Sequence, residues 1–202
     1  AVLRDGRLAV TELLARRGTA ALSGGVEVSG LPSIADIGAE GVPETAGLSG
    51  QFSAAGIHLD DVVELLEKEW EDVDGLAEVT GEIAGTVGDP LISGQLRVAH
   101  ALTSTANITE GLIPFSFRDR VLEARQARLT SHGSELVADA ELDFSTEVPV
   151  LSAGLSAGDI RLEGIRALQE RGWDLAGIIQ IPRADVHGPL DALAGEAILV
   201  GE

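Results

Sequence analysis

The sequence predicts a mainly β fold, in the form of an elongated, twisted and mostly antiparallel sheet with two short helices. Three observations indicate this. Apolar and polar residues alternate with a period of two in several stretches. Gly, Asp-Pro and Gly-Pro turn markers separate those stretches. The chain is 45% hydrophobic but only 3% aromatic. Because large side chains dominate the energetics of a thick core, this composition favours a thin layer.

Alternation marks the expected strands in chain order. Each apolar set would lie on one dry face, with its polar neighbours on the other. The apolar members are Leu22, Val26 and Val28; Ala77, Val79, Ile83 and Val87; Ile113, Phe115 and Phe117; and Leu136, Ala138, Ala140, Leu142 and Phe144.

Two stretches follow the helical period instead. Apolar side chains recur every three to four residues in 59–70 and again in 162–173, and a Trp ends each stretch. Helices this short are not stable alone, so we expect each apolar stripe to pack on the sheet. Trp70 and Trp173 are therefore predicted to plug the helices against the sheet.

The two helices expose an internal repeat with an offset of about a hundred residues. The stretch "GTVGDPLISGQLRV" faces "HGPLDALAGEAILV", with Gly94 opposite Gly195. Upstream, Gly18 lies opposite Gly133, and "LPSIADIGAEGVPE" is an insertion in the first copy. We expect one elongated unit over 1–202, made of two β-repeats at about 1–98 and 99–202. Because the chain contains no Met, even at its first position, we expect it to be part of a longer protein.

Charge and composition exclude several classes of function. The 33 acidic and 14 basic residues give a net charge of −19, which repels phosphate backbones, so nucleic acid is not an expected partner. There is no Cys for a disulfide or a thiolate metal site. His58, His100, His132 and His187 are far apart in sequence and have no ligand spacing. We expect no metal, no cofactor and no catalytic residue.

The order of short helix, small-residue strand, "GTVGDP" and Gly-containing strand resembles the TamB family of translocation and assembly module proteins, which are AsmA-like, repeating β-groove proteins. The lead-in "DGRLAV…GTAALSGGVEVSG" is similar to the same family's strand pairs, so the resemblance covers nearly all of the chain. It implies a sheet curled into an open hydrophobic groove, or β-taco. It also implies a periplasmic location, an inner-membrane anchor outside this fragment, and a role in outer-membrane biogenesis. The chain departs from the family in its acidity and its small interior residues.

The resemblance and the pattern together predict a non-enzymatic module for lipid transport or outer-membrane protein assembly between the two membranes. Its partners would be phospholipid acyl chains or unfolded β-segments, and an Omp85-type barrel. Gly81, Gly85 and Gly94 would leave width in the groove. The predicted lining, which could equally form a closed core, is Val79, Ile83, Val87, Ile92, Leu96, Val98, Leu136, Leu142 and Phe144.

Two other interpretations remain open from the sequence. One is a closed β-solenoid-like stalk or adhesin segment with a filled interior. The other is a hydrolase on a β-scaffold, although no G-x-S-x-G elbow occurs and the carboxylates fall on the wet face. Trp70 and Trp173 could also form a lipid-contacting ring at the groove mouth.

Overall fold

The computed structural model describes residues 2–32, 41–61, 73–102, 107–131, 133–164, 171–173 and 175–201. Apart from connections and the helical residues 59–61, these residues form strands and one short 3₁₀ turn, η1 (Leu162–Gly164). The strands are β1 (Val2–Arg4), β2 (Arg7–Arg17), β3 (Ala20–Ser29), β4 (Gly47–His58), β5 (Asp74–Gly85), β6 (Pro90–Leu102), β7 (Asn107–Arg118), β8 (Val121–Ser131), β9 (Ser134–Asp143), β10 (Val150–Arg161), β11 (Ile178–Pro189) and β12 (Ala194–Gly201).

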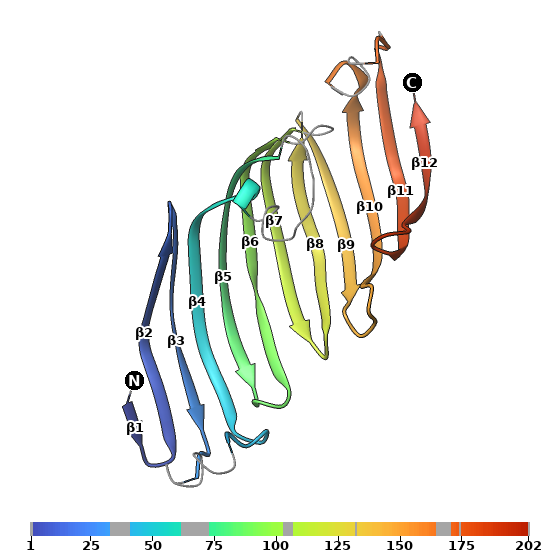
Figure 1. The fold of residues 1–202 in the computed structure, drawn as a ribbon. Coiled ribbons are helices and arrows are strands. Elements are labelled where there is room, and N and C mark those ends of the chain that lie inside the picture. The colour runs from blue at the N-terminus through green and yellow to red at the C-terminus, as the bar shows by residue number, and fades with distance from the viewer. Residues whose placement is uncertain are drawn as a thin grey trace.

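All twelve strands belong to one sheet and lie in it in chain order, from β1 to β12. Each pairs antiparallel with the next, so the sheet is a continuous meander that steps obliquely between its two edges (Figure 1). The predicted mainly β, antiparallel fold is confirmed. Within the described residues β1 and β12 do not pair, so the sheet is open and differs from the closed solenoid of the alternative prediction.

Tight hairpins explain why neighbours in sequence are neighbours in space. At the β7–β8 turn, Asp119 and Arg120 have φ values of 51° and 65°, as a two-residue type I′ turn requires. Between β2 and β3, Gly18 has a φ of 60°, which glycine adopts without steric cost.

The register of the strands sorts side chains onto two faces. Ile83 pairs with Ile92, and Ile92 with Phe117, which pairs in turn with Leu122. We call the side that carries these residues the apolar face. The next residue along each strand points to the opposite side of the sheet. There Glu82 pairs with Ser93, and Glu123 pairs with Glu141. We call this side the polar face.

The sheet is one layer thick in the described part of the chain and has no conventional core. The total accessible surface is 13342 Å², whereas a compact protein of this mass exposes roughly 9000 Å². No large side chain among the described residues is fully buried. Most of the buried apolar residues are small and lie on the apolar face, namely Ala77, Val98, Ala101, Ala127, Ala157 and Ala184.

The two predicted helices fall mostly outside the described residues. Only 59–61 of the first helix is described, and it is helical; Trp70 lies outside the described residues. The second begins as η1, and 165–170 are again outside them. Both helices remain predictions.

Register shifts interrupt several strands and recur in a regular way. β2 and β8 have 11 residues each, and each shifts after its fourth residue, at Val10 and Ala124. β4 and β10 have 12 residues each, and each shifts after its eighth, at Ala54 and Ala157. Such β-bulges bend a strand and increase its twist.

Candidate functional site

The apolar face is the surface on which the sequence-predicted residues meet. A central row crosses ten strands in register, and seven of its members are Gly or Ala. The row is Gly24, Phe52, Gly81, Gly94, Phe115, Ala124, Ala140, Ala153, Val186 and Gly195. The row beside it on one side has Val, Ile, Leu or Phe at every position except two glycines. That row is Val26, Gly50, Ile83, Ile92, Phe117, Leu122, Leu142, Leu151 and Gly188.

Seven of the nine predicted lining residues lie on this face. They are Val79, Ile83, Ile92, Leu96, Val98, Leu136 and Leu142. Val79 lies directly opposite Leu96, and Val98 is only 7% exposed. Alternation therefore placed these side chains together before their register was known.

The other two predicted lining residues lie at connections. Phe144 follows β9, and its ring meets that of Phe117 edge-on, with 6.3 Å between the centroids. Val87 is in the β5–β6 hairpin, where its N–H donates to the carbonyl oxygen of Ala46 at 3.0 Å. The side chain of Val87 is 37% exposed and is not in the rows formed by the strands.

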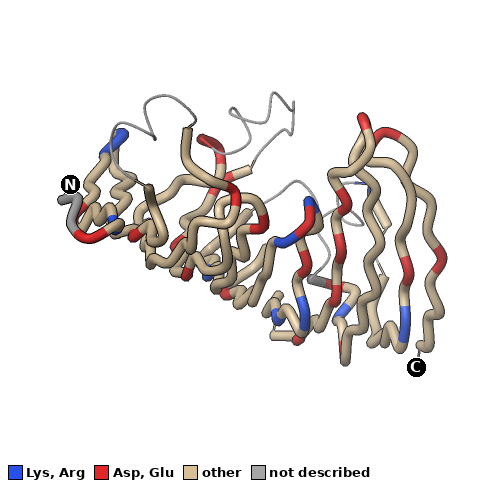
Figure 2. Tube along the Cα trace, turned by 90° about the horizontal axis from the view of Figure 1, so that it is seen from below, with Lys and Arg blue, Asp and Glu red and all other residues tan. Residues whose placement is uncertain are grey.

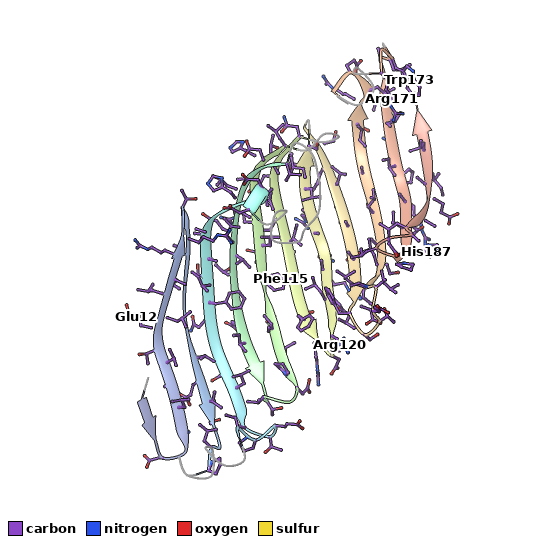
Figure 3. All side chains as sticks on the ribbon, in the orientation of Figure 1. Glu12, Phe115, Arg120, Arg171, Trp173 and His187 are labelled. Atoms are coloured by element: carbon purple, nitrogen blue, oxygen red, sulfur yellow. The ribbon has the colours of Figure 1, made fainter. Side chains whose placement is uncertain are left out.

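Two phenyl rings cover two of the glycines in the central row. A Cβ added to Gly81 would stand 2.5 Å from Cζ of Phe52, and one added to Gly94 would stand 3.0 Å from Cζ of Phe115. Each ring therefore leans from its own strand over the glycine of the next, the arrangement known as aromatic rescue of glycine. The space expected in front of Gly81 and Gly94 is filled in this way, and Figure 3 places Phe115 near the middle of the sheet.

The predicted lining did not include Phe52, Phe115, Phe117, Leu122 and Leu151, which also lie on the apolar face. Alternation in 113–117 already marked Phe115 and Phe117 as one apolar set. Phe52 gave a weaker signal, because its neighbours at the same period are Gly50 and Ala54.

Several ion pairs lie on the polar face, and acidic residues occur along the whole sheet (Figure 2). Arg183 contacts Asp185 with 2.5 Å between Nε and Oδ2, and Arg7 lies 3.7 Å from Glu27. The hydrogen bond from Arg183 lowers the pKa of the Asp185 carboxyl and raises the pKa of the guanidinium. These pairs are exposed and add little stability, so their main effect is to keep this face wet.

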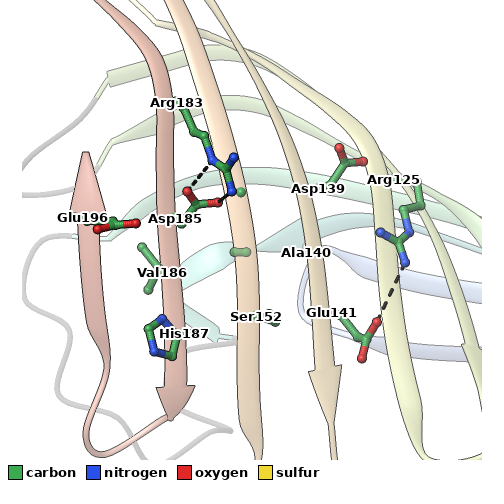
Figure 4. Close-up of a pocket in the computed structure, with 12 residues that line it drawn as sticks. Arg125, Asp139, Ala140, Glu141, Ser152, Arg183, Asp185, Val186, His187 and Glu196 are labelled. Atoms are coloured by element: carbon green, nitrogen blue, oxygen red, sulfur yellow. Dashed lines mark hydrogen bonds and ion pairs between the residues drawn. The ribbon is translucent and has the colours of Figure 1, made fainter. Parts of the chain in front are cut away.

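A hollow of about 400 Å³ lies on the polar face over β8–β12 (Figure 4). Gly154 leaves space at its floor, between Asp139 on one side and Asp185 on the other. Arg125 and Arg183 reach it already engaged with carboxylates. No group of three His, Asp or Glu side chains in the described ranges could hold a metal ion.

Trp173 lies in the turn before β11 and is 53% exposed (Figure 3). Because 165–170 are outside the described residues, its role as a helix plug stays a prediction. No helix among the described residues is long and apolar enough to cross a bilayer.

Comparison with known proteins gives no relative. No family model matches the chain, and neither does any curated protein or solved structure.

Proposed function

We propose that the chain is a non-enzymatic lipid-handling module whose apolar face forms an open hydrophobic groove for acyl chains. The observation that carries this proposal is an apolar face that continues from strand to strand across the sheet, with no second layer over it among the described residues. Monomeric soluble proteins rarely expose a contiguous apolar surface above a few hundred Å², and larger ones mark interaction sites.

The burial of small residues supports a hollowed surface. Ala77 is 3% exposed and Ala157 is 7% exposed, although the described sheet is one layer thick. A methyl side chain rises less above the sheet than the Val and Leu side chains that pair with it on the same face, Val98 and Leu136. A flexible acyl chain suits such a surface, because each CH₂ removed from water stabilises the complex by about 0.8 kcal/mol without directional contacts.

The resemblance to the TamB family supplies the cellular setting of the proposal. It favours a periplasmic location, an inner-membrane anchor outside this chain, and contact with an Omp85-type barrel. Lipid transport suits the apolar face better than binding of an unfolded β-segment, because a peptide lying on that face would leave its backbone polar groups unpaired.

A fluorescent fatty acid tests the proposal on matched variants. Leu96→Asp places a charge on the apolar face, whereas Gln95→Asp makes the same change one residue away on the polar face. Wild type and Gln95→Asp should bind the probe, and Leu96→Asp should bind at least about tenfold more weakly, since a charge is costly in an apolar site.

Circular dichroism on each variant shows that the sheet is retained, and Leu96→Thr provides a milder polar change in case Leu96→Asp does not fold. Failure of the wild type to bind the probe, or equal binding by all variants, would overturn the proposal.

A further inference from the structure

The two rings that cover glycines divide the central row of the apolar face into two parts. Phe52 in β4 lies over Gly81 in β5, and Phe115 in β7, labelled in Figure 3, lies over Gly94 in β6. Two partly buried phenyl rings therefore cover four successive positions of the row. From β8 to β10 the row continues with one methyl side chain on each strand. These residues are Ala124, Ala140 and Ala153.

Apolar side chains stand beside the row on the same face. Ile113 and Phe117 flank Phe115 on β7, and on β8 to β10 one flank continues as a run of leucines. The leucines are Leu122, Leu142 and Leu151. The ring of Phe115 thus fills a space between two flanks. On the next three strands the same row carries methyl groups, with the leucines rising on one side of it.

The internal repeat shows that the strands can pair at this place without a ring over a glycine. β4 and β10 have 12 residues each, and each shifts its register after the eighth. The sixth residue is Phe52 in β4 and Leu155 in β10. Phe52 pairs with Gly81, whereas Leu155 pairs with Ala184. A shorter side chain opposite a methyl group therefore serves the same strand pair in the second copy, so the strand pairing does not depend on the ring.

We propose that Phe52 and Phe115 are stops that confine a bound acyl chain to the β8–β10 part of the apolar face. The inference rests on the proposed function and names the residues that set the position of the lipid. An acyl chain gains free energy from the apolar area that it removes from water. Over β5 and β6 the rings already cover that area. Over β8 to β10 the chain contacts the methyl groups and the leucine flank together.

Phe115 and Phe117 should then affect binding in opposite directions, although they are the same residue type two positions apart in β7. Phe115→Ala uncovers Gly94 and lets the acyl chain lie between the flanks. Phe117→Ala removes part of a flank. We expect Phe115→Ala to bind a fluorescent fatty acid at least about fourfold more tightly than the wild type, the effect of one further CH₂ removed from water. Phe117→Ala should bind it more weakly by a similar factor.

A fatty acid with a diazirine near its methyl end shows where the acyl chain lies. After photolysis and peptide mass mapping, the wild type should carry the label within 121–161, which spans β8 to β10. Labelling should extend into 74–102, which spans β5 and β6, only in Phe115→Ala. Circular dichroism on each variant shows that the sheet is retained. Phe115→Leu, whose side chain is too short to cover Gly94, is the milder change in case Phe115→Ala does not fold.

Three results would overturn the inference while wild-type binding leaves the proposed function standing. The first is that Phe115→Ala binds the probe no more tightly than the wild type, so that the ring is contact surface or has no effect. The second is tighter binding by both Phe variants. The third is labelling of 74–102 in the wild type. Absence of the probe from the wild type and from every variant would overturn the proposed function, and this inference with it.

Discussion

Two glycines of the apolar face lie beneath phenylalanine rings. Gly81 and Gly94 are directly paired, and Phe52 and Phe115 lean over them from the strands on either side. Each ring thus covers its own position in the central row and the position of the neighbouring glycine. A side chain at Gly81 or Gly94 would clash with the ring that lies over it. Two of the four Phe residues in the chain therefore cover a larger part of the apolar face than their own two positions.

Gly94→Ala should destabilise the fold. An added Cβ would stand 2.8 Å from Cα of Gly81 and 3.0 Å from Cζ of Phe115. Because one of these atoms belongs to the backbone of a paired strand, we expect a loss of about 1–3 kcal/mol in the free energy of unfolding. Urea denaturation measures it.

Gly158→Ala in β10 is the control for this change. A Cβ added to Gly158 would meet no heavy atom within 4 Å, and the φ of this residue is not positive. The substitution should alter the free energy of unfolding by no more than ~0.5 kcal/mol. Equal effects of the two substitutions would show that the ring-over-glycine packing contributes nothing.

Residue placement was predictable where alternation is unbroken and failed where a connection interrupts it. Period-two spacing located Val79, Ile83 and Leu96 on one face, because strand geometry leaves only two sides. Val87 continued that spacing in the sequence but lies in the hairpin, where turn geometry decides its direction. Phe52 was missed because small residues surround it in the pattern, and only the register reveals what its ring covers.

At the scale of the strand, β-bulges set the local bend. Gln126 in β8 has a φ of 53°, a left-handed conformation that is uncommon for residues other than glycine, and its N–H donates to Oδ1 of Asp139 at 2.8 Å. The register shifts between Ala124 and Ala127 at this point. The bulge thus combines backbone strain with a side-chain acceptor on the neighbouring strand.

Gln126→Gly should leave the fold as stable as before or stabilise it by up to ~1 kcal/mol, because glycine adopts positive φ freely. Arg128→Gly in the same strand should destabilise it, since glycine weakens a regular strand position. Thermal unfolding of the two variants compares them directly. A greater loss of stability in Gln126→Gly would contradict the assignment of strain to this bulge.

The strands with clear alternation, β3, β5, β7 and β9, followed from the sequence, whereas bulges and pairing order did not. A β-bulge needs no particular residue type. The stretch "RQAR" therefore contains no signal that the pairing of β8 with β9 is interrupted at Gln126. The recurrence of shifts at the same positions of β2 and β8, and of β4 and β10, becomes visible only once register is known. Helical periodicity in 59–70 and 162–173 remains a prediction, because most of the first segment and half of the second lie outside the described residues.

For the molecule as a whole, the low aromatic content indicated a thin layer, and the described part of the chain forms a single open sheet. Sequence alone could not decide between an open and a filled interior, because an apolar strand face looks the same in either case. The strand order resolves the architecture, since β1 and β12 stand at opposite edges. We propose that acyl chains cover the apolar face, because an apolar surface is costly in water unless a guest or a partner covers it.

Native mass spectrometry of the chain, produced in a diderm bacterium and purified without detergent, tests the central claim most directly. We predict that wild type and Gln95→Asp carry adducts with phospholipid masses and that Leu96→Asp does not. A wild-type spectrum containing only the mass of the bare chain would contradict acyl-chain binding on the apolar face.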